Sequence, residues 1–191
     1  MEAKVIYMTD ETLLEGCRRN DRSSQRQFYE RHFNQMSWLC YRYVKDKNIA
    51  DDIVHEGFIK VFKSLNSYEG KGSLEGWIKR IMVNCCLDYL RKTQRRPDPL
   101  PLSEINEQFY DEEILAGLQA DYILEKIQDL PHLQRTVFNL NIIEGYPHKD
   151  IAKMLNIKAS TSRAYLTEAR QMLRKSLEQT YQKKERRVYN G

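Results

Sequence analysis

The sequence predicts an all-α protein built from two small helical domains that an acidic linker joins. Apolar residues recur three and four positions apart in the first half of the chain and again in its last third, which is the spacing of one helix face. Between these parts lies Pro97-Asp-Pro99-Leu-Pro101, and three prolines in five residues cannot continue a helix. We therefore expect domains at residues 1–96 and 121–180, a linker at 97–120 and a basic tail at 181–191.

Charge divides the chain in the same way. Residues 1–96 hold 18 basic and 13 acidic side chains, residues 97–130 hold 1 and 9, and residues 131–191 hold 12 and 5. Basic domains suit DNA, because neutralising its phosphates releases counterions. No stretch approaches the roughly 20 apolar residues of a membrane span, and the N-terminus has no basic segment followed by an apolar core. We therefore expect a cytoplasmic protein without membrane insertion.

Three amphipathic helices are expected in the first domain. The first covers about residues 24–44 and the second about residues 50–65, each with apolar side chains on one side. The third begins at Ser73, which is a good N-cap after a glycine-bearing loop, and continues to Lys92. Three such helices are enough to enclose a small core.

The outer face of the second helix is acidic at one end. Its polar residues are Asp51, Asp52, His55, Glu56 and Lys60. A metal site here would need further ligands, so a solvated acidic face is the simpler interpretation. His55-Glu56 begins like a metalloprotease motif, but the second histidine would stand at the position of Ile59.

Cysteine spacing and loop composition also argue against a cofactor. The four cysteines lack the paired spacing of a zinc site and are expected to be reduced core residues; they are Cys17, Cys40, Cys85 and Cys86. Neither a glycine-rich phosphate loop nor a nucleophile-elbow pattern is present in the sequence. We expect no metal, no cofactor and no enzymatic activity.

The third helix of the first domain ends in positive charge, with four basic residues between Arg91 and Arg96. A loop that contains Tyr68 and two glycines precedes this helix. An aromatic loop beside a basic helix suits single-stranded DNA, because bases stack on rings while cations hold the backbone. Many helical domains also carry a core tryptophan and a basic helix end, so this pattern alone leaves the structural alternative open.

The segment from Asp150 to Arg170 predicts a helix-turn-helix. Asn156 is suited to the left-handed conformation of a sharp turn, and Ser160 is expected to accept a hydrogen bond from the N–H groups that open the second helix. The second helix, at about residues 160–175, then shows hydroxyl groups, arginines and one tyrosine, which suit the major groove. A solvated amphipathic hairpin is the alternative.

In their order and spacing, residues 50–62, 76–84 and 130–138 and the helix-turn-helix resemble bacterial sigma factors of the extracytoplasmic-function class. The resemblance covers about residues 10–178. It implies two domains, the region 2 helical bundle and the region 4 helix-turn-helix, and a protein that directs RNA polymerase to promoters. The implied partners are the beta-prime and beta subunits of core RNA polymerase, promoter DNA and an anti-sigma factor.

The resemblance also assigns residues to three surfaces. Implied contacts with core polymerase are Asp51, Asp52, His55, Glu56, Phe58 and Lys60. Implied contacts with the melted minus-ten element are Tyr68, Lys71, Ser73, Trp77, Lys79, Arg80, Asn84, Arg91 and Lys92. Implied contacts with the minus-thirty-five element are Lys158, Ser160, Thr161, Arg163, Tyr165, Thr167, Glu168 and Arg170.

Several residues depart from the family pattern. His55 stands where relatives carry glutamine, and Pro147 stands where many carry a helix-capping serine, although proline suits a first helical position. Ser162 replaces an apolar residue, so we expect a slightly less anchored recognition helix. Tyr165 and Glu168 replace arginines, so the promoter sequence of a relative does not transfer.

Two other functions fit parts of the sequence. A plain DNA-binding regulator would use the helix-turn-helix on duplex DNA and the N-terminal helices for dimerisation or signal binding. A helical metal-dependent hydrolase built around residues 51–56 is a more distant alternative. Binding to core RNA polymerase separates both alternatives from the sigma factor.

Overall fold

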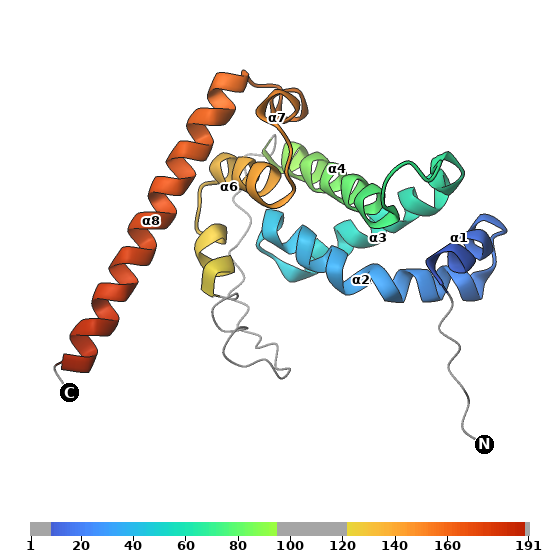
Figure 1. The fold of residues 1–191 in the computed structure, drawn as a ribbon, viewed down its shortest axis with the longest axis horizontal. Helices are drawn as coiled ribbons and strands as arrows, with labels where there is room; N and C mark the ends of the chain where they lie inside the picture. Colours follow the sequence, from blue (N-terminus) through green and yellow to red (C-terminus); the bar gives the residue numbers. More distant parts are fainter. Residues whose placement is uncertain (1–8, 95–121, 190–191) are drawn as a thin grey trace. The chain divides into compact units, whose positions relative to one another are not determined.

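The computed structural model describes residues 9–94 and 122–189, with side chains for residues 9–93 and 122–178. Within these ranges the chain is helical and contains no strand, which confirms the all-α class (Figure 1). Backbone contacts divide the chain into two compact units, Met1–Pro101 and Leu102–Gly191, here called unit 1 and unit 2. The expected linker at residues 97–120 lies outside the described residues.

The described part of unit 1, residues 9–94, contains four α-helices and one short turn of 3-10 helix. The elements are α1 (Asp10–Arg18), α2 (Arg22–Val44), α3 (Lys47–Ser64), the 3-10 turn η1 (Leu65–Ser67) and α4 (Leu74–Gln94). The three helices expected from the sequence are α2, α3 and α4. Helix α1 was not expected, because its nine residues are too few for the periodic pattern to stand out.

The core of unit 1 lies where α2, α3 and α4 pack together. Phe28 and Phe58 are at most 2% exposed, and their ring centroids lie 6.5 Å apart in an edge-to-face arrangement. Helices α3 and α4 approach closely at Gly57. A Cβ atom added at this position would lie 2.2 Å from the sulfur of Met82, so a larger residue would not fit without a shift. Cys17, Cys40, Cys85 and Cys86 are free thiols and buried, as expected.

In unit 2, the described residues 122–189 form the helix of residues 122–128 and four further elements. They are α6 (His132–Phe138), the π-helical turn η2 (Asn139–Ile143), α7 (His148–Leu155) and α8 (Ala159–Tyr189). Helices α6 and α7 both pack against α8. The buried apolar residues that hold them together are Val137, Leu140, Ile151, Leu166 and Ala169.

The turn between α7 and α8 follows the sequence prediction at one residue and departs from it at another. Asn156 has φ 53° and ψ 49°, which confirms the left-handed conformation. Helix α8 begins at Ala159, so Ser160 is already helical and the prediction that it caps the helix is wrong. At the other end of α7, the helix begins at His148, so Pro147 is its N-cap and not its first helical residue.

Helix α8 is longer than the sequence suggested. It extends through 31 residues to Tyr189, well beyond the expected end near Lys175 and through most of the expected basic tail. Mainly polar and charged residues follow Leu177. The periodic apolar residues that mark a packed helix face therefore end near Leu177, whereas the helix continues to Tyr189.

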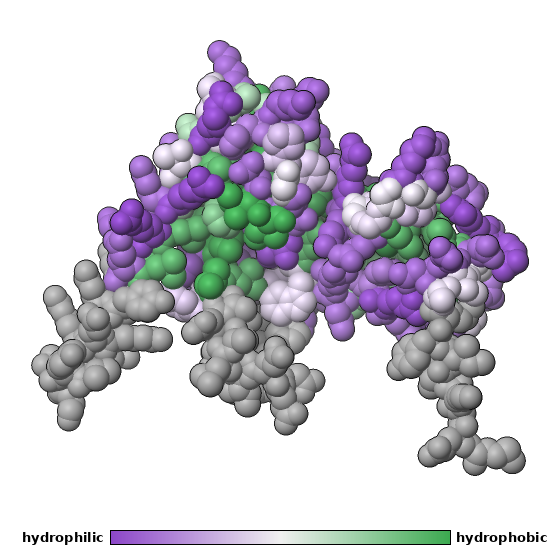
Figure 2. Space-filling model, viewed as in Figure 1, coloured by the Kyte–Doolittle hydropathy of each residue, from purple (hydrophilic) through white to green (hydrophobic). Residues whose placement is uncertain are grey.

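The two units differ in the polarity of the surfaces seen in Figure 2. Hydrophilic residues cover most of unit 1 there, whereas unit 2 shows a hydrophobic area over α6 and the adjoining side of α8. Ile123, Ile142, Ile143 and Met172 of unit 2 are 50%, 44%, 41% and 44% exposed. Among the described helices, none combines the length and the apolar character that crossing a membrane requires.

Candidate nucleic-acid and protein interfaces

An acidic face lies on the outer side of α3. Asp52, His55 and Glu56 are exposed, and their spacing of three and four residues places them on one side of the helix. Asp51 is half-buried, and its carboxylate accepts a hydrogen bond from the hydroxyl of Ser37 on α2. Two carboxylates and one imidazole are therefore exposed on this face, while Asp51 joins α3 to α2 through its hydrogen bond.

Aromatic side chains of α2 hold His55 in place. The imidazole stacks on Tyr29, with centroids 5.9 Å apart and planes inclined by 11°. It also stacks on Phe33, at 6.0 Å and 28°. Because two rings restrict its rotation, His55 presents a fixed edge beside Asp52 and Glu56, a feature that glutamine at this position would lack.

The two remaining residues assigned to polymerase binding differ in accessibility, since Phe58 is buried and Lys60 is exposed one turn beyond Glu56. Phe58 is 2% exposed and packs on Tyr29 with ring centroids 4.9 Å apart, so its side chain is not accessible to another protein. Lys60 is directed toward α4, where its Nζ atom lies 3.6 Å from a carboxylate oxygen of Asp88. Phe58 supports the acidic face from beneath, and Lys60 joins α3 to α4.

The loop between η1 and α4 is organised around Tyr68. Its hydroxyl donates a hydrogen bond to the carbonyl of Gly72 at 2.9 Å, and its ring lies 5.4 Å from that of Trp77, inclined by 44°. Its own carbonyl accepts a hydrogen bond from Arg18 Nη2 at 2.8 Å. Sequence reasoning missed Arg18, because it is 50 residues away in the chain and lies on the unexpected helix α1.

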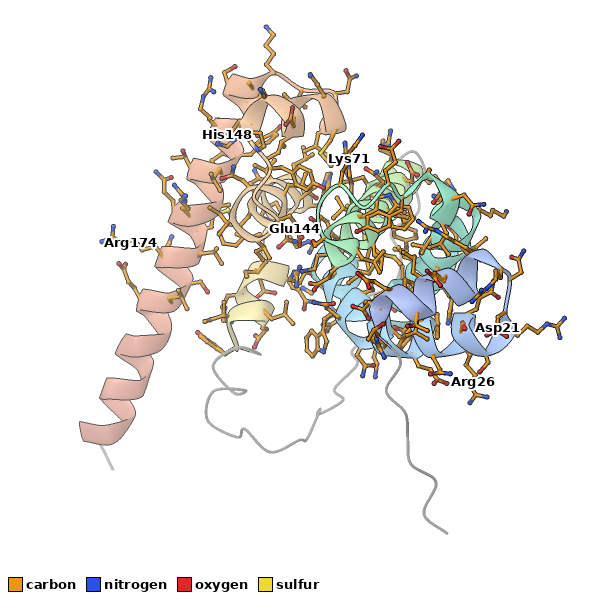
Figure 3. All side chains as sticks on the ribbon, turned by 45° about the vertical axis from the view of Figure 1, so that its right-hand side comes forward. Asp21, Arg26, Lys71, Glu144, His148 and Arg174 are labelled. Atoms are coloured by element: carbon orange, nitrogen blue, oxygen red, sulfur yellow. The ribbon has the colours of Figure 1, made fainter. Side chains whose placement is uncertain are left out.

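The tip of this loop bends at glycines. Gly70 and Gly72 have φ angles of +74° and +92°, which favour glycine. Lys71 between them, labelled in Figure 3, is exposed, and its Nζ atom is 2.5 Å from the carboxylate of Glu69. Ser73 Oγ accepts a hydrogen bond from the N–H of Gly76 at 3.1 Å, which confirms the predicted cap of α4.

One face of α4 carries the donors expected to meet DNA. Trp77, Arg80, Asn84 and Arg91 recur at spacings of three, four and seven residues, and the last three are exposed. Asp88 lies on the same face and accepts a hydrogen bond from Arg91 at 2.6 Å. The face therefore combines an aromatic ring, an amide and two guanidinium groups, with one carboxylate that partly neutralises Arg91.

Lys79 and Lys92 lie away from the centre of this face. Lys79 is two residues from Trp77, so its side chain leaves the other side of α4, and its Nζ atom is 2.6 Å from Glu75. Gln35 of α2 also donates to this carboxylate, and the hydrogen bond from Lys79, followed by that from Gln35, lowers the pKa of Glu75. Lys92 is exposed near the end of α4.

The exposed face of α8 begins at its first turn. Ser160, Arg163 and Thr167 are exposed and recur three and four residues apart, with Arg170 at the edge of the same face. Gln171 lies one turn beyond Thr167 and is also exposed. Sequence reasoning omitted Gln171, although its spacing of four residues from Thr167 was a usable signal.

The other residues assigned to this face are placed less favourably. Thr161 and Tyr165 are half-buried, on the flank of α8. Glu168 is exposed but accepts a hydrogen bond from Gln134 of α6 at 2.8 Å. Lys158 is exposed immediately before α8 begins.

A buried polar contact joins the two helices of the motif. Ser162 is fully buried, and its Oγ atom lies 2.9 Å from Nδ1 of His148, the first residue of α7 (Figure 3). A buried hydroxyl with a partner avoids the cost of an unsatisfied polar group. A hydrogen bond to α7 therefore stands where an apolar contact was expected to be lost, and the lower anchoring of α8 expected from Ser162 stays a prediction.

The described part of the chain shows no metal centre, since no three His, Cys, Asp or Glu residues there are arranged to hold an ion. The three surfaces described above are instead open to solvent and carry charged, polar or aromatic side chains of the kinds that bind nucleic acid or charged protein surfaces.

Comparison with known families and structures identifies both units. Residues 28–96 match the model of Sigma-70 region 2, and residues 120–173 match that of Sigma-70, region 4. The chain is 27% identical over 183 residues to the ECF RNA polymerase sigma-E factor of Haemophilus influenzae, covering 90% of this chain and 96% of that protein.

Two further relatives agree with these matches. Over 153 residues the chain is 33% identical to the ECF RNA polymerase sigma factor SigE of Mycolicibacterium smegmatis, covering 75% of this chain and 57% of the relative. Its fold is similar to that of sigma factor RpoE from Bartonella quintana, solved in complex with the anti-sigma factor NepR, with a TM-score of 0.56, 18% identity and coverage of 80% and 96%. Two sigma-70 regions in the expected order, and relatives aligned over most of the chain, show that it belongs to the extracytoplasmic-function class of RNA polymerase sigma factors.

Proposed function

We propose that this sigma factor reads promoters at two points, with unit 1 holding the melted minus-ten strand and unit 2 holding the minus-thirty-five duplex. The observation that supports this assignment is that each matched region carries its own exposed face of nucleic-acid-binding groups, on α4 and on α8. Sigma factors are non-catalytic regulators of transcription. RNA synthesis is therefore the task of core polymerase, in the cytoplasm, and this chain supplies the choice of promoter.

Unit 1 has the groups that a single strand needs. Tyr68 and Trp77 offer aromatic surfaces on which a base can stack, which is worth about 1–3 kcal/mol per base. Asn84 is exposed on the same side and pairs well with a base edge, because its amide both donates and accepts. Arg80 and Arg91 are placed to hold phosphates along α4.

The acidic face of α3 is the proposed contact with the beta-prime coiled coil of core polymerase. Asp52 and Glu56 are exposed carboxylates, and His55 is fixed between them and the aromatic rings of α2. Exposed charges of this kind steer association and set specificity more than they add affinity. Binding through this face should therefore weaken as salt concentration rises.

Unit 2 is proposed to place α8 in the major groove of the minus-thirty-five element. Arg163 is suited to a bidentate contact with guanine, and Thr167 and Gln171 lie along the same face. The exposed Ile142 and Ile143 of the π-helical turn provide an apolar surface that we assign to the beta subunit of polymerase. Unit 2 would then bind both duplex DNA and the enzyme.

An anti-sigma factor is the proposed regulator. The structural relative from Bartonella quintana was solved with such a protein bound. A regulator that covers the acidic face of α3 or the donor face of α8 would prevent binding to polymerase or DNA. Competition between core polymerase and the inhibitor for the purified protein would test this part of the proposal.

Reconstituted transcription tests the proposed function as a whole. The protein is mixed with core RNA polymerase, a promoter DNA library and nucleotides, and the transcripts are sequenced. We expect transcripts that start downstream of shared minus-ten and minus-thirty-five elements. Failure to bind core polymerase at micromolar concentration would contradict the proposal and favour a plain DNA-binding regulator.

A matched pair of charge reversals tests the polymerase face. Glu56→Lys should reduce core binding, because it places a cation on the acidic face of α3. Glu30→Lys is the control, since Glu30 is an exposed carboxylate on α2 that pairs with Arg26 rather than lying on that face. Equal loss of core binding in both variants would remove the acidic face from the proposal.

A further inference from the structure

We propose that Arg18 is a positioning residue for minus-ten recognition, because it holds the loop that carries Tyr68 in the shape that receives a base. The inference rests on the proposed function of unit 1. Arg18 lies in α1, outside both segments that match the sigma-70 models, at residues 28–96 and 120–173. It belongs to none of the three surfaces assigned above.

Helix α1 is fixed firmly enough to act as a support. A Cβ atom on Gly16 would lie 2.1 Å from Ser24 Oγ, so α1 meets the beginning of α2 at very close range. Asp21, between the two helices, accepts hydrogen bonds from the N–H and the hydroxyl of Ser24, at 2.8 and 2.6 Å (Figure 3). Leu13 and Cys17 are at most 2% exposed. The end of α1 therefore has a defined position.

Arg18 uses that position to reach the loop. Its Nη2 atom donates to the carbonyl of Tyr68 at 2.8 Å. The N–H of Tyr68 donates to the carbonyl of Leu65 at 3.2 Å, and its hydroxyl donates to the carbonyl of Gly72 at 2.9 Å. Both of these bonds join Tyr68 to residues within four positions of it in the chain. The bond from Arg18, by contrast, joins the loop to a separate helix.

The loop needs such a tie because two of its residues are glycines. Gly70 and Gly72 adopt positive φ angles and have large conformational freedom when the loop is not held. Fixing the backbone before DNA arrives removes part of the ordering cost from binding. The bond from Arg18 thereby keeps the ring of Tyr68 beside Trp77, where a base is proposed to stack.

Arg19 offers a matched control for charge. It is the next residue, is exposed and carries the same charge, but it forms the C-cap of α1 and its backbone N–H donates back into that helix. A general attraction between α1 and phosphates would involve Arg18 and Arg19 alike. A positioning role requires Arg18 alone.

The test uses holoenzyme reconstituted with core polymerase. The probe is single-stranded minus-ten DNA from a promoter recovered in the transcription experiment, with 2-aminopurine at each position in turn to detect an unstacked base. Arg18→Ala should weaken binding about three- to tenfold, the fold-change that corresponds to the net contribution of one ordinary hydrogen bond, because the bond from Arg18 is exposed to solvent. Arg18→Lys should restore most of the affinity, because an ammonium group also donates to a carbonyl. Arg19→Ala should change binding less than about twofold.

Several outcomes decide the matter. Binding by Arg18→Ala equal to wild type, or equal losses from Arg18→Ala and Arg19→Ala, would overturn the positioning role. The dependence of binding on salt concentration gives a further criterion. If Arg18→Ala reduces this dependence more than Arg19→Ala does, Arg18 contacts a phosphate and the positioning role is overturned. Failure of the wild-type holoenzyme to bind the probe, or Tyr68→Ala with unchanged binding, would instead contradict the proposed function of unit 1. Unchanged binding of the minus-thirty-five duplex and core polymerase by Arg18→Ala is the expected control.

Discussion

Unit 1 and unit 2 present their candidate DNA-binding residues in different ways. In unit 1 the groups come from three elements: Arg18 at the end of α1, Tyr68 in the loop, and Trp77 with Asn84 on α4. In unit 2 a single exposed face of α8 carries them. A surface assembled from several elements depends on the contacts between those elements, whereas a single helix face depends mainly on its own side chains.

The supporting contacts differ accordingly. In unit 1, bonds such as that from Arg18 to Tyr68 hold candidate DNA-binding groups directly. In unit 2, the bond between His148 and Ser162 holds α8 from its buried side and leaves Arg163 exposed. We therefore expect coupled effects of substitutions in unit 1 and nearly additive effects along α8.

The largest expected effect tests whether each unit has its own core. Phe28→Ala removes a fully buried ring from unit 1 and should lower the free energy of unfolding by about 3–5 kcal/mol. Both tryptophans of the chain, Trp38 and Trp77, lie in unit 1, so their fluorescence during urea unfolding reports on that unit. Ile151→Ala, a matched core truncation in unit 2, should leave the tryptophan transition in place. Equal shifts in both variants would show that the cores do not unfold separately.

The next effect concerns the helix face of unit 2. Arg163→Ala should cost about 1–3 kcal/mol of affinity for the minus-thirty-five duplex if the guanidinium reads a base bidentately, and it should relax sequence preference at one position. Arg174→Ala is the control, because Arg174 lies three turns further along α8 and pairs with Glu178 at 2.9 Å. Fluorescence anisotropy with a panel of base-substituted duplexes measures both quantities. Uniform weakening by Arg163→Ala across the panel would reassign this residue to the phosphate backbone.

A smaller effect follows from one desolvated histidine in each unit, His32, which is buried, and His132, which is half-buried. Desolvation lowers the pKa of His32 in unit 1 and of His132 in unit 2. The unfolded chain then binds protons that the folded chain does not, so stability falls as pH falls below about 6.5. The slope is at most about 1.4 kcal/mol per pH unit for each histidine.

Tryptophan-detected unfolding at pH 7.5 and 5.5 separates these two histidines. His32→Gln should reduce the pH dependence of the transition, because His32 lies in the unit that the tryptophans report. His132→Gln should leave that dependence as it is. The reverse pattern would contradict the assignment of His32 as a buried neutral group.

The smallest expected effect concerns the contact behind α8. His148 and Ser162 should show a coupling energy of about 0.5–1.5 kcal/mol in a double-mutant cycle of alanine variants, measured by helical circular dichroism during unfolding. The same cycle with His148 and Thr161 is the control, since Thr161 is half-buried on the flank of α8. Coupling of equal size in the two cycles would mean that the hydrogen bond does not fix α8.

Much of the fold followed from periodic apolar residues. Helices α2, α3 and α4 appear close to their expected bounds, and Asn156 has the left-handed conformation that a sharp turn favours. The recognition face of α8 was also predictable, because residues one turn apart share a face wherever the helix begins. Ser160 shows the limit of this reasoning, since the helix begins two residues earlier than a capping Ser160 requires and Ser160 therefore lies inside it.

The rest depended on tertiary contacts that a linear pattern does not contain. Arg18 meets Tyr68 across 50 residues of chain, and Ser162 meets His148 across 14. Phe58 lies on α3 among the acidic residues, yet packing against α2 buries it. Neighbouring residues on one helix therefore do not share a function merely because they are close in sequence.

Site-specific crosslinking in the initiation complex tests the central claim most directly. A photoreactive amino acid is placed at position 84 on α4 or at position 163 on α8, and the holoenzyme is bound to a promoter labelled on each strand. Position 84 should crosslink to unpaired minus-ten DNA and position 163 to the upstream duplex. Crosslinking of both positions to duplex DNA alone, or of position 84 to no DNA, would contradict a sigma factor that reads its promoter at two points.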